Sequence, residues 1–205
     1  NPALDVALRV RAGVALDHFQ AFHNDAVVLG DHFNDLAALA GRLDVVGLEQ
    51  KHLDSGLLPN IAKITENGEA AKLEPTFPAV TSTVQASILS GKYPREHGII
   101  ANGLYDRSTY SVSFWEQSSS IVKAQRLWDT IKQKNSKKTA VLFWQNTMYA
   151  NSDIVVTPRP IHLDDKMVMW CYSKPVGYYE KLKEKLGEFN LASYWGPLAS
   201  SKSSE

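Results

Sequence analysis

The sequence predicts an α/β fold with a largely parallel sheet, and two observations lead to this class. After Leu43, short apolar runs that read as buried strands alternate with segments whose apolar residues recur at helical spacing. Such alternation is typical of a parallel sheet whose strands are joined by helices. The composition, 44% hydrophobic residues with 22 basic and 22 acidic side chains, is that of a globular domain with a sizeable core.

Charge balance and apolar run length exclude two classes of partner. Because the formal net charge is zero, the chain has no basic excess for binding a nucleic-acid polymer. No apolar run approaches the roughly 20 residues that cross a bilayer, so we expect no membrane segment in this chain. The single cysteine, Cys171, excludes both an intrachain disulfide and a cysteine-rich zinc site.

Each expected element follows from its apolar spacing and from the glycines and prolines around it. Pro59 near the start and Gly68 after the end indicate a short helix, and Gly91 ends a second one. In chain order, the elements are a strand over 43–48, helices over 58–64 and from Thr81 to before Gly91, a helical stripe of Ala124, Leu127, Trp128 and Ile131, strands over 139–144 and 154–156, and a helix whose apolar face carries Tyr178, Tyr179, Leu182 and Leu186.

Thr81 is the residue that points most directly to chemistry. It follows a proline-rich approach and falls in the first turn of the expected helix. There a hydroxyl lies beside backbone N–H groups without intrahelical partners and at the positive end of the helix dipole. Those N–H groups can hold phosphate oxygens, so the position suits a nucleophile that attacks an anionic ester. The alternative is that Thr81 is only the N-cap of this helix.

The stretch 76–103, TFPAVTSTVQASILSGKYPREHGIIANG, resembles the nucleophile segment of the type I phosphodiesterase/nucleotide pyrophosphatase family in the alkaline phosphatase superfamily. The resemblance implies an alkaline-phosphatase-like α/β/α sandwich. It assigns Thr81 as the nucleophile and Asn102 as the side chain that binds a phosphoryl oxygen, with the N–H of Ser82 adding to the phosphate cradle. His97 belongs to the turn signature, and we expect it to fix the turn and not to bind metal.

The resemblance also implies a metal centre. Asp44 falls at the strand-end position where the family has a metal ligand, and Thr81 would bind the same ion. The resemblance implies two divalent ions, with zinc as the expected metal, and the further Asp and His ligands are expected beyond residue 205. Residues 43–205 are therefore expected to be the amino-terminal part of a longer, alkaline-phosphatase-like domain.

The implied activity is metal-dependent hydrolysis of a small phosphodiester or nucleotide through a phosphothreonine intermediate. This 205-residue piece is expected to be inactive alone, because most of the implied metal ligands are not in it. Eukaryotic members follow the nucleophile with Phe-Pro-Asn-His, whereas this chain has Ser-Thr-Val-Gln over 82–85, so phosphonates and other phosphodiesters stay open as substrates. A non-catalytic, truncated α/β binding domain is the alternative.

The first 42 residues form a separate segment by composition. Every lysine and every serine of the chain lies after residue 42. Within the segment, 26–39 resembles the magnesium loop of haloacid-dehalogenase-like phosphatases, with Asp31 and Asp35 as paired carboxylates. Those enzymes need an upstream Asp-x-Asp nucleophile, which is absent here. A relic of that fold, a helical surface, an unrelated fused segment and an out-of-frame translation remain open for this part.

Overall fold

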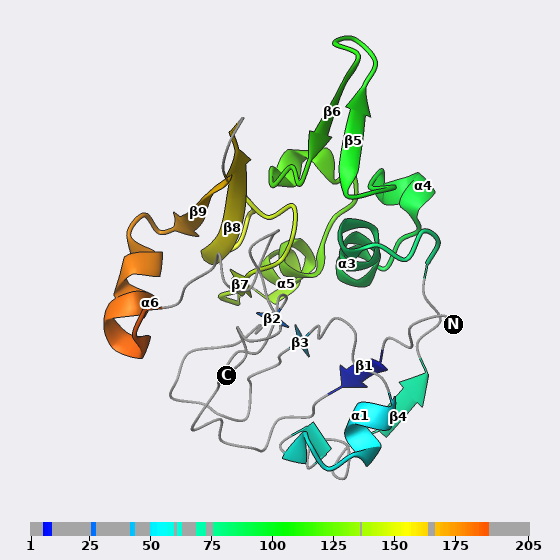
Figure 1. Cartoon of the computed structure of the whole chain (residues 1–205), viewed down its shortest axis with the longest axis vertical. Helices are drawn as coiled ribbons and strands as arrows, with labels where there is room; N and C mark the ends of the chain where they lie inside the picture. The colour runs from blue at the N-terminus through cyan, green and yellow to red at the C-terminus, as the bar shows by residue number, and fades with distance from the viewer. Residues whose placement is uncertain are drawn as a thin grey trace.

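The computed structural model describes residues 6–9, 26–27, 42–43, 50–59, 61–62, 69–72, 76–135, 137–163 and 167–188 (Figure 1). Asp44, Asp31 and Asp35 lie outside the described residues. Its elements, in order, are β1 (Val6–Arg9), β2 (Ala26–Val27), β3 (Arg42–Leu43), α1 (Gln50–Asp54), β4 (Glu69–Lys72), α3 (Thr81–Ser90), α4 (Pro94–His97), β5 (Gly103–Asp106), β6 (Ser111–Phe114), a 3-10 turn (Ser119–Ile121), α5 (Leu127–Asn135), β7 (Ala140–Leu142), β8 (Ile154–His162), β9 (Met167–Lys174) and α6 (Tyr178–Leu186).

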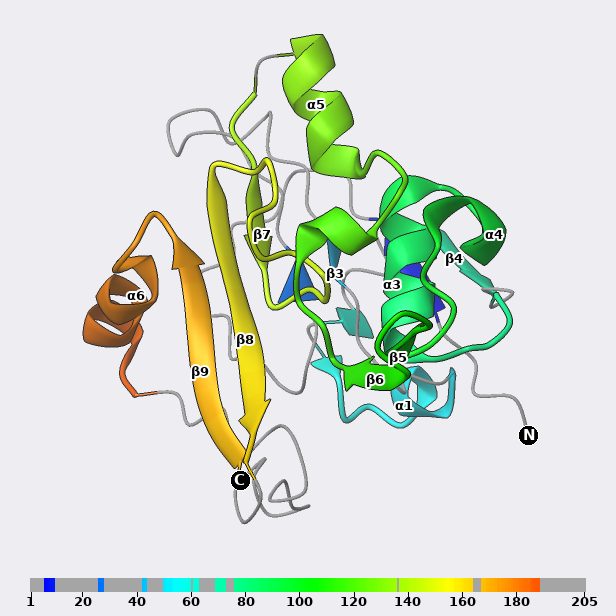
Figure 2. The same cartoon turned by 90° about the horizontal axis from the view of Figure 1, so that it is seen from above.

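The centre of the described fold is the sheet β7–β8–β9. Strand β7 pairs with β8 in parallel, and β8 pairs with β9 in antiparallel orientation from Val155 to His162. Helix α6 lies beside β9 at the outer edge, while α3 lies on the far side of β7 (Figures 1 and 2). The buried core between α3, α5 and the sheet is formed by Leu89, Trp128, Val141, Trp144, Ala150 and Val155.

The predicted α/β class is confirmed, but parallel pairing among the described strands is confined to β7 and β8. The pairs β1–β4, β2–β3, β5–β6 and β8–β9 are antiparallel. The links 107–110 and 163–166 are too short to return a chain to the same end of a sheet, so the strands that they join run antiparallel. The parallel pair is instead joined by the longer loop Phe143–Asp153.

Two elements differ in extent from the expectation. Strand β8 continues past Val156 to His162 and includes Pro158 and Pro160. The neighbouring strand β7 ends opposite Val156. Among the described strands, β8 pairs beyond that point with β9 alone, and a proline is tolerated where the other side of a strand is unpaired. Helix α5 begins at Leu127, so Ala124 precedes it. The expected helix over 58–64 is described only in part, with a bond from the Ala62 N–H to the Leu58 carbonyl (2.9 Å).

Parts of the amino-terminal segment pair with the rest of the chain. Strand β1 pairs with β4, and β2 pairs with β3, whose two residues lie across the predicted boundary at residue 42. The division into 1–42 and 43–205 stays a prediction. Among the described helices, none is both long and apolar enough to cross a membrane.

Candidate active site

Thr81 is the first residue of α3, and its hydroxyl is not used to cap the helix. Val80 holds the N-cap position in an extended conformation, and its carbonyl accepts the first helical bond from Val84 N–H (2.9 Å). The interpretation of Thr81 as the N-cap is therefore wrong. Thr81 is half-buried, and its hydroxyl has no hydrogen-bond partner among the described residues. A hydroxyl in this position is available to a ligand at the positive end of the helix.

Asn102 lies against this helix start, although it is distant in sequence. Its Oδ1 accepts a hydrogen bond from the Ser82 N–H (2.9 Å). Since a backbone N–H can only donate, this bond fixes the orientation of the carboxamide and leaves Nδ2 as a donor. The Asn102 carbonyl accepts from Trp115 N–H (2.9 Å), which ties the residue to the end of β6. The structure thus brings Thr81, Ser82 and Asn102 together.

Ser82 takes part through its backbone. Its side chain is only 3% exposed, and its N–H serves Asn102. The sequence led us to expect that this N–H adds directly to a phosphate cradle. In the structure it orients Asn102 instead, while the N–H groups of Thr81 and Thr83 are the ones that the helix leaves without intrahelical partners.

The turn that delivers Asn102 is built around His97. The His97 ring is fully buried, its Nδ1 accepts from Ile99 N–H (3.1 Å), and its Nε2 lies 2.9 Å from Ser87 Oγ on α3. Because Nδ1 is the acceptor, the ring is the neutral tautomer that donates from Nε2. Gly98 then reverses the chain with φ 80°. Nδ1 is bonded within the turn and Nε2 ties the turn to α3, so the prediction that His97 fixes the turn is confirmed.

We expect the contribution of His97 to stability to fade in acid. Burial lowers the pKa of His97 below its usual 6.5, against a smaller opposing effect of Glu96. A lowered pKa means that the unfolded chain binds the proton more readily, so this contribution is complete above pH 6.5 and is lost as the pH falls through the lowered pKa. His97→Gln should cost about 1–3 kcal/mol at pH 7.5, the scale for an unsatisfied buried partner, and less at pH 5. Urea unfolding of both proteins at the two pH values measures this, and an equal cost at both would contradict it.

The described residues do not form a metal centre by themselves. No group of three or more His, Cys, Asp or Glu side chains capable of holding an ion occurs in the described part of the chain. Asp44, the predicted metal ligand, lies outside that part. The predicted pair of divalent ions therefore stays a prediction.

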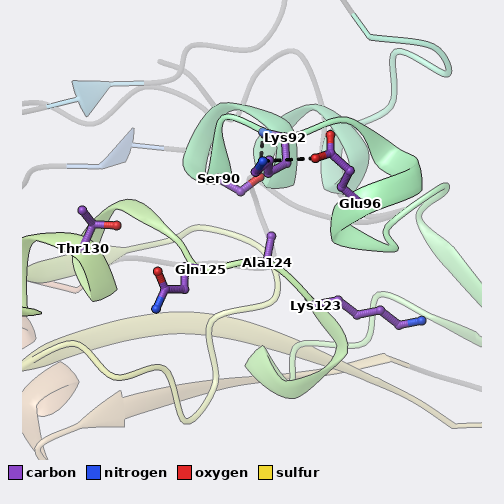
Figure 3. Close-up of a pocket in the computed structure, with 7 residues that line it drawn as sticks. All are labelled: Ser90, Lys92, Glu96, Lys123, Ala124, Gln125 and Thr130. Atoms are coloured by element: carbon purple, nitrogen blue, oxygen red, sulfur yellow. Dashed lines mark hydrogen bonds and ion pairs between the residues drawn. The ribbon is translucent and has the colours of Figure 1, made fainter.

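A cavity of about 430 Å³ lies at the other end of α3 from Thr81. It is lined by Ser90, Lys92, Glu96, Lys123, Ala124, Gln125 and Thr130 (Figure 3). Lys92 Nζ and Glu96 Oε1 are 3.1 Å apart, so these two charges satisfy one another. Because ten helical residues span about 15 Å, this cavity is not part of the candidate active site.

Sequence reasoning missed a buried set of amides that joins α3 to the loop Phe143–Asp153. Gln85 Oε1 accepts from Gln145 N–H (2.9 Å), and Gln117 Oε1 accepts from Asn146 N–H (3.1 Å). The side chains of Gln117 and Gln145 also bond to each other. The one available signal was that Gln85 lies four residues after Thr81, and therefore on the same face of the helix.

A buried arginine supports the same loop. Arg126 is 6% exposed, donates to the Asn146 carbonyl and lies with its guanidinium carbon 4.5 Å from the centre of the Trp128 ring. Burial lowers the pKa of Arg126 to about 10, so the group stays charged at neutral pH. The charge is compensated by the carbonyl and by the face of the indole.

Comparison with known proteins places the chain in a family. The model of the type I phosphodiesterase / nucleotide pyrophosphatase family matches residues 43–204. The chain therefore belongs to this family, which has the alkaline-phosphatase-like α/β fold. The family match begins where the predicted second segment begins, and it includes Thr81, Ser82 and Asn102.

Curated relatives agree with the family match. Ectonucleotide pyrophosphatase/phosphodiesterase family member 1 of Rattus norvegicus is 31% identical over 84% of this chain, and the Homo sapiens protein of the same name is 34% identical over 50%. A Bis(5'-adenosyl)-triphosphatase of Mus musculus is 27% identical over 76% of the chain. The matches cover 18%, 12% and 34% of those three relatives. No solved structure matches the chain significantly.

Proposed function

We propose that this chain carries the nucleophile half of a metal-dependent hydrolase of phosphodiester or pyrophosphate bonds, with Thr81 as the nucleophile. The observation that carries the proposal is the contact of Asn102 Oδ1 with Ser82 N–H, 2.9 Å, directly beside Thr81. This contact supports the proposal because it holds the Asn102 carboxamide at the amino terminus of α3, next in sequence to Thr81. Family membership supports the same class of reaction.

The chemistry follows from these groups. Thr81 Oγ1 attacks phosphorus in line, its proton passes to solvent, and a phosphothreonine forms as the bond from phosphorus to the leaving oxygen breaks. Asn102 Nδ2 donates to a non-bridging oxygen, and the N–H group of Thr81 adds a further donor. Water then cleaves the phosphothreonine and releases the second product. Donors that are fixed in advance stabilise the charge that develops on phosphorus at little reorganisation cost.

The metal part of the proposal rests on Asp44 and on the family resemblance. Two divalent ions, with zinc as the expected metal, would lower the pKa of the attacking hydroxyl and offset charge on the phosphoryl group. One carboxylate and one hydroxyl are too few protein ligands for a stable zinc site. We therefore infer that the 205-residue chain alone hydrolyses phosphodiesters barely, if at all.

The test is release of nitrophenol from a nitrophenyl phosphodiester, with and without zinc. The 205-residue chain is compared with the complete product of its gene. We expect hydrolysis by the complete product that a chelator abolishes and zinc restores, and little or none by the 205-residue chain. Absence of hydrolysis in both would reject the enzyme and favour a non-catalytic binding domain. Strong activity of the short chain would refute the inference that it is only part of a site.

A further inference from the structure

A chain of buried side-chain amides leads from the helix of Thr81 to the strand end that holds Asn102. Gln85 lies one turn after Thr81 on α3, and its Oε1 accepts a hydrogen bond from Gln145 N–H (2.9 Å). The Gln145 side chain accepts in turn from Gln117 Nε2, which also donates to the Trp115 carbonyl (3.3 Å). Gln85, Gln117 and Gln145 are at most 5% exposed, and we call them the glutamine chain.

The glutamine chain is part of a closed cycle of hydrogen bonds. Trp115 N–H donates to the Asn102 carbonyl (2.9 Å), and Asn102 Oδ1 accepts from Ser82 N–H (2.9 Å), which brings the path back to α3 beside Thr81. The helix start and Asn102 are therefore held together twice, once by the Ser82–Asn102 bond and once through the glutamine chain. A shift of one against the other would strain bonds on both paths.

Gln117 is the most constrained member of this cycle. Its side chain is fully buried, and Oε1 accepts from Asn146 N–H (3.1 Å) and from Thr157 Oγ1 (3.3 Å). Its Nε2 donates to the Trp115 carbonyl and to the Gln145 side chain, so both donors and both acceptor sites of the amide are used. A buried amide with all its bonds made has one orientation, and it fixes the groups that it contacts.

The backbone beside the glutamine chain is strained and needs this support. Trp115, Phe143 and Asn146 have positive φ, at 55°, 62° and 56°. A bulky residue adopts such a conformation where the surrounding structure imposes it, and such residues cluster at functional sites. Gln117 contacts the backbone of two of the three, at the Trp115 carbonyl and the Asn146 N–H.

We propose that Gln85, Gln117 and Gln145 are positioning residues, which hold the Thr81 hydroxyl and the Asn102 carboxamide in a fixed relation to one another. The inference rests on the proposed function, because both groups must face the same phosphoryl group. The glutamines act through Thr81 and Asn102 and not on the substrate. Their loss should therefore slow the chemical step, since a small misplacement of reacting groups by a distant change can cost about 100-fold in rate.

The first test measures kcat and KM of the complete gene product for a nitrophenyl phosphodiester. Gln85→Met and Gln117→Met keep the length of the side chain but remove its amide. Each should lower kcat roughly 10- to 100-fold and leave KM nearly unchanged. Gln85→Glu, which keeps an oxygen acceptor for Gln145 N–H, should recover most of the lost kcat. Equal kcat of Gln85→Glu and Gln85→Met, or a rise in KM alone, would contradict a positioning role.

Ser152→Ala is the matched control for lost stability. Ser152 is as buried as Gln117 and lies in the same loop, but its Oγ donates to the Thr139 carbonyl (2.8 Å), outside the cycle. The substitution should lower the unfolding midpoint and leave kcat unchanged. A fall in kcat equal to that of Gln117→Met would show that stability, and not position, limits the rate, and the proposal would be overturned.

A second test does not depend on hydrolysis. Ser82 N–H has Asn102 Oδ1 as its partner, so its hydrogen exchange in the 205-residue chain reports whether Asn102 is in place. By NMR, exchange at Ser82 should be several-fold faster in Gln85→Met and Gln117→Met, and unchanged in Ser152→Ala. If the complete gene product proves inactive, the proposed function fails, while this exchange still decides the role of the glutamine chain. Unchanged exchange in the two folded methionine variants would refute that role.

Discussion

Thr81→Ala should abolish phosphodiester hydrolysis by the complete gene product. The substitution removes the only atom that the proposal gives to the attack on phosphorus, and on the scale for loss of an enzyme nucleophile the rate should fall by roughly 10⁴-fold or more. Stability should change little, because the hydroxyl has no partner among the described residues and does not cap α3. The measurements are nitrophenol release at saturating substrate and a thermal unfolding curve.

Thr81→Ser is the matched control, since it keeps a hydroxyl at the same helix position. It should retain turnover and form a phosphoserine that mass spectrometry detects on the peptide containing residue 81 after rapid acid quench. Full activity of Thr81→Ala, or a covalent phosphate on another residue, would overturn the mechanism.

Asn102→Ala should slow the chemical step by roughly 10²–10³-fold, the scale for removing one donor to a developing oxyanion. The effect should appear in kcat, because the Nδ2 donor is most valuable when charge builds on the phosphoryl oxygens. Single-turnover rates of the complete gene product, measured with both proteins saturated in substrate, isolate this step from product release.

The two functions of Asn102 can be separated by Asn102→Asp. A carboxylate still accepts from the Ser82 N–H, so the helix start and the unfolding midpoint should be preserved. The donor is replaced by a negative charge, however, so catalysis should be at least as poor as in Asn102→Ala. If the aspartate variant were as active as the unchanged protein, Asn102 would be a purely structural residue.

The candidate site was predictable where its residues belong to one continuous stretch. The positions of Thr81 at a helix start and of His97 in a turn follow from local patterns of proline, glycine and apolar residues. The pairing of Asn102 with Ser82 could only be expected by resemblance, because it depends on how the turn folds back on α3. The resemblance assigned a role to the Ser82 N–H but could not indicate that Asn102 occupies it.

Other features depend on contacts that the sequence does not indicate. Gln85 and Gln117 are buried although no apolar periodicity in the sequence marks their positions, and glutamine is usually expected at the surface. The prolines of β8 argue against a strand until one knows that β7 stops opposite Val156. Register and burial decide both cases, and each arises from contacts between segments that are distant in the chain.

The turn around His97 also has a consequence for how this segment can change. His97 is bonded to Ser87 on α3, and Asn102 is bonded to Ser82 in the first turn of the same helix. Residues 98–101 must therefore span the distance between two fixed points on α3. Within residues 98–101 the side chain of Ile100, which is 61% exposed, can vary, whereas Ile99 is 1% exposed and Gly98 has φ 80°; the length of the segment cannot vary. We expect an inserted or deleted residue in 98–101 to leave His97 in place and the protein folded. It would move the Asn102 carboxamide away from Thr81.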